Sequence, residues 1–311
     1  MHIILPIIGF FLIGFAARRF IAEPRFVVKW INHFIIYISL PAIIFLKVPQ
    51  LEFSSQVIIP AIAAWLWLFC GIALTLLFSR WLSWTRPIEG AVLLLVTMGN
   101  TSFLGYPMVL AFFDDTVLSY AIFYDQLGGF LILSTYGSII VSIYSSPPQD
   151  TSMAKSLSRS ETLKIVKKIA TFPPFISLFI SLTLPVSELV SAVEPALNLI
   201  ASLLMPAALF ILGVQFQPHL LPEHKVPLLL AISLKMMLAP LMAIVIVAIL
   251  GGSIDVRNAT VFESAMPSMV TPGLMAIAAG IAPRFVVTML GYCTLVGFVT
   301  LPIIAFYLKS I

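Results

Sequence analysis

The sequence predicts an all-α polytopic membrane protein of ten transmembrane helices, arranged as two inverted five-helix repeats. Of its 311 residues, 60% are hydrophobic and 10% are charged, whereas about a quarter of the residues in a soluble domain are charged. A helix needs roughly 20 apolar residues to cross about 30 Å of hydrocarbon. Ten stretches meet this need: residues 2–20, 29–48, 56–79, 88–113, 116–144, 169–186, 188–216, 226–250, 256–281 and 284–308.

The first stretch has the length of a secretory signal peptide. It has no basic residue before its apolar run and no convincing small-residue cleavage site, both of which signal peptides carry. We therefore expect residues 2–20 to form the first span.

A proline pattern recurs in the two halves of the chain. Residues 40–46 and 205–211 both contain Pro-Ala-x-x-Phe at an offset of 165 residues, and Pro107 and Pro272 share that offset. Internal repetition of this kind marks a duplicated unit. It predicts repeats at residues 1–145 and 169–311, joined by a linker at 146–168 that ends in a short basic helix.

The distribution of lysine and arginine predicts the orientation. Thirteen of these residues fall on one side of the predicted spans and three on the other, and Lys235 lies within a span. Because basic residues concentrate in cytoplasmic loops, the thirteen are expected in the cytoplasm and both termini outside. The thirteen are Arg18, Arg19, Arg25, Lys29, Arg80, Arg86, Lys155, Arg159, Lys164, Lys167, Lys168, Lys225 and Arg284, and the three are Lys47, Arg257 and Lys309. Five spans per half then invert the second repeat.

Spans four and nine are interrupted at their middle, over residues 99–107 and 265–273. Proline removes a backbone donor and stops or kinks a helix. Backbone groups freed in this way are tolerated at membrane depth only where protein or a polar cavity satisfies them. Interrupted helices at corresponding positions of two halves point to the binding site of a transporter.

The interruptions supply the predicted substrate-binding residues. Their neutral polar side chains and the partial positive charge of half-helix N-termini suit an anion such as a carboxylate. Alternatively, these side chains only satisfy the interrupted backbone. The predicted set is Asn100, Thr101, Ser102, Gly105, Pro107, Pro267, Ser268, Thr271 and Pro272.

Three ionisable residues, Asp125, Lys235 and Glu263, lie well inside spans. Charge at that depth costs several kcal/mol, so such residues are functional candidates. Either carboxylate could carry a coupling proton, or could form only a structural hydrogen bond or ion pair. Lys235 could attract an anionic substrate, pair with a carboxylate, or extend toward the cytoplasm.

Other chemistries lack a signal in the sequence. Cys70 and Cys293 have no metal-ligand spacing, and no nucleotide-binding or hydrolase motif is present. We therefore expect no cofactor, no metal and no enzymatic activity, with energy drawn from a proton or sodium gradient or the membrane potential. The net charge of +4 reflects cytoplasmic residues that meet lipid headgroups, so nucleic acid is not an expected partner. His33 is expected to be a polar anchor.

The interrupted segments carry a family resemblance. Residues 100–107, Asn-Thr-Ser-Phe-Leu-Gly-Tyr-Pro, resemble the fourth-helix signature of the auxin efflux carrier family, in which asparagine precedes the crossover proline by seven residues. Residues 265–272, with Leu301-Pro302 in the last span, are similar to the corresponding pattern of the ninth and tenth helices. The resemblance covers essentially the whole chain.

The resemblance implies a fold similar to that of bile acid sodium symporters. A scaffold domain would comprise spans 1, 2, 6 and 7, and a transport domain spans 3–5 and 8–10, with the broken helices crossing near Pro107 and Pro272. Family members usually form dimers and are thought to work as elevators. The short linker resembles that of bacterial members, whose assigned substrates are malonate, malate and other small carboxylates, while plant carriers move auxin.

Together these features predict a secondary transporter of small organic anions in a bacterial inner membrane, driven by protons or by the membrane potential. The nearest alternative is a sodium-coupled symporter of the bile-acid type, in which Glu263 and nearby carbonyls would coordinate the cation. A channel or a non-transporting membrane sensor is the alternative from another class.

Overall fold

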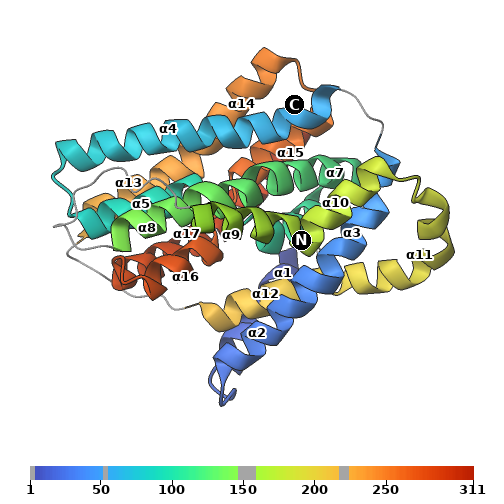
Figure 1. Cartoon of the computed structure of the whole chain (residues 1–311), viewed down its shortest axis with the longest axis horizontal. Coiled ribbons are helices and arrows are strands. Elements are labelled where there is room, and N and C mark those ends of the chain that lie inside the picture. The colour runs from blue at the N-terminus through green and yellow to red at the C-terminus, as the bar shows by residue number, and fades with distance from the viewer. Residues whose placement is uncertain (1–3, 52–54, 146–158, 217–223) are drawn as a thin grey trace.

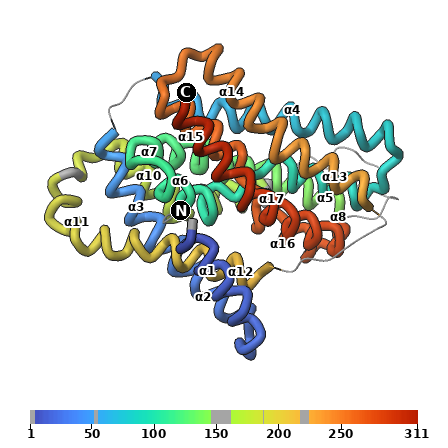
Figure 2. The backbone as a smooth tube through the Cα atoms, turned by 180° about the vertical axis from the view of Figure 1, so that it is seen from behind, coloured from blue at the N-terminus to red at the C-terminus, as the bar shows by residue number. Residues whose placement is uncertain are grey.

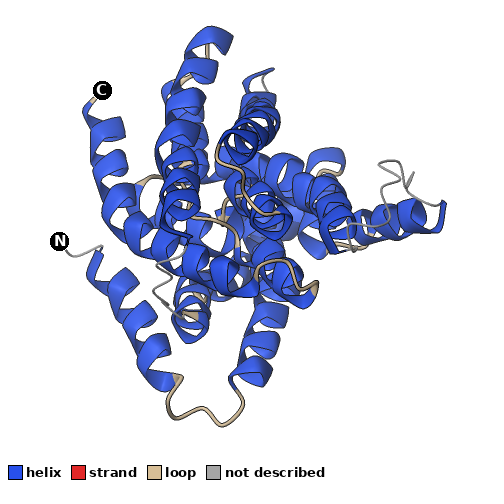
Figure 3. Ribbon diagram, turned by 90° about the vertical axis from the view of Figure 1, so that its left-hand side faces the viewer, coloured by secondary structure: helices blue, strands red, loops and turns tan. Residues whose placement is uncertain are grey.

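The computed structural model describes residues 4–51, 55–145, 159–216 and 224–311. Over these ranges the chain is helical, and an isolated bridge between two residues is the one piece of β-structure (Figure 3). Six helices of the described part are long and apolar enough to cross a membrane. They are Pro24–Gln50, Ser55–Trp81, Asp115–Ser145, Glu188–Gln215, Lys225–Leu250 and Pro283–Ser310. Thr162–Ala170 and Pro173–Thr183, bent by 61°, would make a seventh as one broken span.

The first half of the chain begins with a short helix and continues in longer, segmented ones. Its α-helices are α1 (Ile4–Ala17), α2 (Pro24–Phe34), α3 (Leu40–Lys47), α4 (Ile59–Trp81), α5 (Arg86–Thr97), α6 (Tyr106–Phe112), α7 (Asp115–Phe123) and α8 (Ser138–Ser145). Between them lie the π-helical turns η1 (Ile35–Ser39), η4 (Thr101–Gly105), η5 (Tyr124–Phe130) and η6 (Leu133–Gly137), and the 3-10 turns η2 (Val48–Gln50) and η3 (Ser55–Ile58).

The second half repeats this alternation of long and segmented helices. It comprises α9 (Arg159–Ala170), α10 (Pro173–Thr183), α11 (Ser187–Ser202), α12 (Leu204–Gln215), α13 (Lys225–Ser233), the π-helical turn η8 (Leu234–Leu238), α14 (Ala239–Leu250), α15 (Ile254–Ser264), α16 (Val270–Ala278) and α17 (Pro283–Ser310). Of the predicted linker, residues 146–158 lie outside the described residues, and the remainder begins α9, so its predicted helix is confirmed.

Each of the ten predicted spans overlaps helical segments, but fewer than ten are long apolar helices. Two of the predicted spans that are not single long helices are the interrupted ones. The structure divides the first into α5 and α6 and the second into α15 and α16. The first predicted span is α1, with 14 helical residues. The described residues thus contain six helices, or seven with the bent pair, that have the length and composition to span a membrane. The count of ten and the repeat architecture stay predictions.

The helices pack in two groups. In Figures 1 and 2, α1, α2, α3, α10, α11 and α12 lie together at one end, beside a larger group that contains α4, α5 and α13–α17. Within the first group, α1 crosses α12 so closely that a side chain on Gly14 would meet the carbonyl oxygen of Phe210. A side chain on Gly213 would likewise meet the carbonyl oxygen of Phe11. Glycine at both positions allows this approach of the two backbones.

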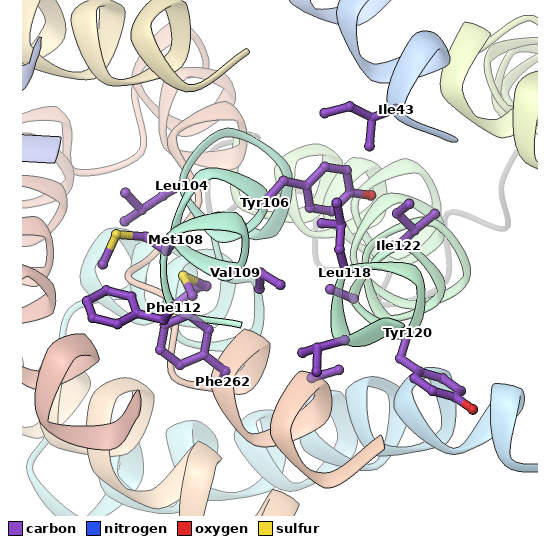
Figure 4. Close-up of a cluster of buried hydrophobic side chains, with 14 of the residues drawn as sticks. Ile43, Leu104, Tyr106, Met108, Val109, Phe112, Leu118, Tyr120, Ile122 and Phe262 are labelled. Carbon is purple, nitrogen blue, oxygen red and sulfur yellow. The ribbon is translucent and has the colours of Figure 1, made fainter. Parts of the chain in front are cut away.

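The segment α6 packs against α7 and against α12 of the first group. Leu104, Met108, Val109 and Phe112 are buried in one apolar cluster with residues of α3, α7 and α15, including Phe262 (Figure 4). Phe112 and Phe262 meet edge to face, with ring centroids 6.1 Å apart. This packing surrounds the half-helix that follows the first interruption and fixes its position.

Candidate functional site

The two interruptions meet and pair through their backbones. Gly99 faces Ser268 in an isolated antiparallel bridge. The N–H of Asn100 donates to the carbonyl of Pro267 at 2.7 Å, and the N–H of Met269 donates to the carbonyl of Met98 at 3.0 Å. Backbone groups that have no intrahelical partner thereby satisfy one another, as burial requires.

The non-helical stretches are shorter than the predicted ones. The first covers residues 98–100, and the chain is helical again from Thr101 to Phe112. The second covers residues 265–269. The two segments therefore meet N-terminal to Pro107 and Pro272, which lie within the half-helices that follow. Pro107 is the second residue of α6, the helix that directly follows the π-helical turn η4. That turn accommodates a residue that has no backbone donor.

Lys235 links the second interruption to a long helix. It lies on η8 and is fully buried, and its Nζ donates to the carbonyl oxygen of Ser264 at 2.7 Å. Ser264 is the last residue of α15. The C-terminal end of a helix carries the negative end of the helix dipole and therefore favours a cation. A side chain on Gly99 would approach the Lys235 ammonium to 3.1 Å. One lysine thus lies against both interrupted segments.

Asp125 binds the half-helix that follows the first interruption, residues 101–112. It lies on η5 and is buried, and its carboxylate accepts from the hydroxyls of Thr101, Ser102 and Tyr106 and from the side-chain amide of Gln126. The bonds to Oδ2 measure 2.6 Å from Ser102, 3.0 Å from Tyr106 and 2.7 Å from Gln126. Four donors satisfy one buried carboxylate and attach the start of the second half-helix to this turn.

Glu263, unlike Asp125, has a carboxyl group that is buried without hydrogen-bond donors in the described part of the chain. It is fully buried one residue before Ser264, and neither carboxyl oxygen has a hydrogen-bond partner among the described residues. The carboxyl group lies against Gly105, where an added side chain would meet both oxygens. The glycine therefore leaves room for Glu263. A buried polar group without a partner requires an explanation in function or in a missing ligand.

A cavity of about 240 Å³ opens beside the meeting point. Its polar lining is neutral and comes from Asn32, Asn100, Gln215 and Thr271, and its walls are Ile36, Phe103, Ala208, Ile211, Leu212, Val270 and Leu274. We call it the inner cavity. Asn100 and Phe103 belong to the start of one half-helix, and Val270 and Thr271 begin the other. Both positive half-helix ends therefore border the cavity, which favours an anion there.

A second cavity of about 710 Å³, the outer cavity, adjoins the inner one. The two share the lining residues Asn32, Ile36, Leu212, Gln215, Val270 and Leu274. The outer cavity adds a basic edge formed by Arg18, Arg25, Lys29 and His33. Together they form a path between α2 and α12 on one side and α16 and α17 on the other.

Comparison with known proteins places the chain in a family. A family model described as a membrane transport protein matches residues 1–305. The chain belongs to this family, the auxin efflux carriers.

Two archaeal relatives agree with the assignment. An uncharacterized transporter of Methanocaldococcus jannaschii is 29% identical over 188 residues, which are 58% of this chain and 56% of that protein. The match thus spans little more than half of that relative's length. An uncharacterized transporter of Methanothermobacter thermautotrophicus is 23% identical over 277 residues, 88% of this chain and 86% of the relative.

Within this membrane transport protein, the predicted site residues divide into three sets. Asn100 and Thr271 line the inner cavity. Thr101 and Ser102 bind Asp125 instead. The remaining members are buried and do not line either cavity: Gly105, Pro107, Pro267, Ser268 and Pro272.

Sequence reasoning did not propose Asn32 or Gln215 for the site. Each lies toward an end of a predicted span, where polar residues are ordinary. Asn32 lies on α2, before the apolar part of its span, and Gln215 is the last residue of α12. Their spacing alone carries no sign that they face Asn100.

Proposed function

We propose that this protein is a secondary transporter that carries small organic anions, with carboxylates as the substrate class. The observation that carries the proposal is the inner cavity, where the first turns of two half-helices present Asn100 and Thr271. Amide and hydroxyl donors next to positive helix ends suit a carboxylate. The basic edge of the adjoining outer cavity attracts the same charge.

The proposed architecture has ten spans in two inverted repeats, 1–145 and 169–311. Reciprocal packing supports it, because α1 of the first unit packs on α12 of the second, while α10 of the second packs on α3 of the first. Helices of spans 1, 2, 6 and 7 would form the scaffold, and the others the transport domain. Since the cavities lie between these groups, sliding of one against the other would expose the site alternately, as in an elevator.

We further propose a homodimer in the cell inner membrane, with both termini periplasmic. The thirteen basic residues on the opposite side support this orientation. The lipid bilayer and a small carboxylate are the other proposed partners.

Proton or potential coupling is the proposed energy source, with Asp125, Lys235 and Glu263 as coupling or charge-balancing groups. The unpartnered carboxyl group of Glu263 also favours a second candidate, sodium coupling, since carboxylate oxygens suit hard cations. An unchanged pH and sodium profile in Glu263→Gln would count against either role.

Transport currents from purified protein in liposomes test the proposal. The protein would be challenged with malonate, malate, indole acetate and a neutral control, with and without proton and sodium gradients. Saturable anion currents are expected, and uphill accumulation that follows pH but not sodium would indicate proton coupling. Sodium-dependent currents would favour the second candidate. Non-saturable currents would indicate a channel, and silence across a carboxylate panel would contradict the proposal.

A further inference from the structure

The outer cavity has basic side chains along one helical face. Arg25, Lys29 and His33 are spaced by four residues on α2, so they project from the same side of the helix. All three are exposed, and all three line the outer cavity. Asn32, three residues after Lys29, and Ile36, three residues after His33, line both cavities. The row of basic residues therefore leads to the inner cavity.

Membrane topology alone does not account for this arrangement. The positive-inside rule concerns the side of the membrane on which basic residues lie. It does not determine which face of a helix carries them. On α2 the large apolar side chains Phe26 and Trp30 are exposed away from the cavity lining, while Arg25 and Lys29 lie within it. The basic groups thus face the path rather than the lipid.

Arg25 and Lys29 have no counter-charge among the described residues. Neither Arg25 nor Lys29 forms an ion pair with a described residue, and the described lining of the outer cavity contains no Asp or Glu. Arg18, at the same edge, donates to the carbonyl of Phe216 at 2.9 Å. Positive side chains in a concave apolar wall focus a field that attracts anions.

We propose that the outer cavity is a separate binding site for the organic anion, in which Arg25 and Lys29 hold the carboxylate before it moves to Asn100 and Thr271. The class of ligand is a monocarboxylate with an apolar body, because Leu274, Ile277 and Leu290 form the wall opposite the basic row. The inner cavity holds no charged side chain, so a second carboxylate would enter it without a counter-charge. This inference rests on the proposed function.

A thiol introduced at Val28, which lines the outer cavity, tests the site without transport. In a Cys70→Ser/Cys293→Ser background, Val28→Cys is labelled with anionic and cationic thiol reagents of equal size. The anionic reagent is expected to react faster, and Arg25→Gln/Lys29→Gln should lower the anionic-to-cationic rate ratio about tenfold. Indole acetate should slow labelling, also when Asn100→Ala is present. A ratio that the double change leaves unaltered, or the absence of protection, would overturn the proposal.

Transport kinetics give the second test, with Lys164→Gln/Lys167→Gln as the matched control. These two exposed lysines of α9 lie on the same predicted side but do not line either cavity. At low salt, Arg25→Gln/Lys29→Gln should raise KM about tenfold at an unchanged maximal rate, and the difference should shrink at high salt. A KM equal to that of the control would overturn the outer site while leaving the proposed function intact. A wild type that moves no carboxylate, yet shows charge-selective and protectable labelling, would overturn the proposed function alone.

Discussion

The Nζ of Lys235 lies 2.7 Å from the carbonyl oxygen of Ser264. A buried lysine of η8 thus caps the C-terminal end of α15. Lys235 also approaches Gly99 of the other interruption. Because the two segments pair through only a short bridge, this side chain stabilises a junction with few other polar contacts. It is therefore expected to support both the fold and the site.

Replacing Lys235 with methionine keeps much of the side-chain volume and removes the donor. The carbonyl of Ser264 would then be buried without its partner, at a cost of about 1–3 kcal/mol. We expect a lower thermal unfolding midpoint in detergent and slower transport. Lys225→Met, on an exposed residue at the start of the same span, is the control and should leave both unchanged. Equal midpoints for the two variants would show that the bond does not stabilise the junction.

Asp125 is the second polar junction, and its four donors allow a graded experiment. Thr101→Val and Ser102→Ala each remove one donor to a carboxylate and should cost about 1.5–3 kcal/mol. Asp125→Ala leaves four buried donors without their acceptor and should cost more than either, at least about 3 kcal/mol. The ranking would be measured by thermal unfolding of the purified variants.

Asp115→Asn is the control for this series. Asp115 pairs with Lys47 at 2.7 Å, but its side chain is 59% exposed, and exposed ion pairs contribute less than about 1 kcal/mol. If Asp125→Ala were no more harmful than Asp115→Asn, the buried network would have no structural role.

How far the sequence predicted this site depended on whether the signal was local. Helicity follows from composition, and the two interruptions were predicted from local runs of small, polar and proline residues. The hydrogen bonds of Thr101 and Ser102 to Asp125 were not predicted, because Asp125 lies more than 20 residues away on another helix. The π-helical turns that carry Asp125 and Lys235 likewise have no local sequence signal.

The contact between Gly105 and Glu263 predicts a strong dependence on side-chain size. Gly105→Ala would place a methyl group against both carboxyl oxygens, and overpacking of this kind costs about 1–3 kcal/mol. In a Glu263→Ala background the space is free, so the same change should cost less than about 1 kcal/mol. Thermal unfolding of the four proteins of this cycle would measure the coupling.

Gly9 supplies the matched glycine for this cycle. A side chain at Gly9 would have no neighbour within 4 Å, so Gly9→Ala should be neutral or slightly stabilising, given the helix propensity of alanine. Costs for Gly105→Ala that are the same with and without Glu263 would contradict direct contact between the two residues.

The inner cavity predicts different roles for two polar residues of the interruptions. Asn100 lines the cavity, whereas Ser268 is buried and donates to the sulfur of Cys293 at 3.5 Å. A hydrogen bond to a charged ligand contributes about 1.5–3 kcal/mol, and each 1.4 kcal/mol is about a tenfold change in affinity. Asn100→Ala should therefore raise the KM for the transported carboxylate at least about tenfold.

Ser268→Ala should leave that KM within about twofold, because the hydroxyl is directed at Cys293 and does not line the cavity. The backbone bond from Asn100 to Pro267 does not involve either side chain, so both variants should fold and reach the membrane in normal amounts. Uptake into liposomes at graded substrate concentration distinguishes them. Full transport by a well-expressed Asn100→Ala variant would remove this residue from the site, and an equal loss in both variants would mean that the junction, and not the cavity, determines substrate affinity.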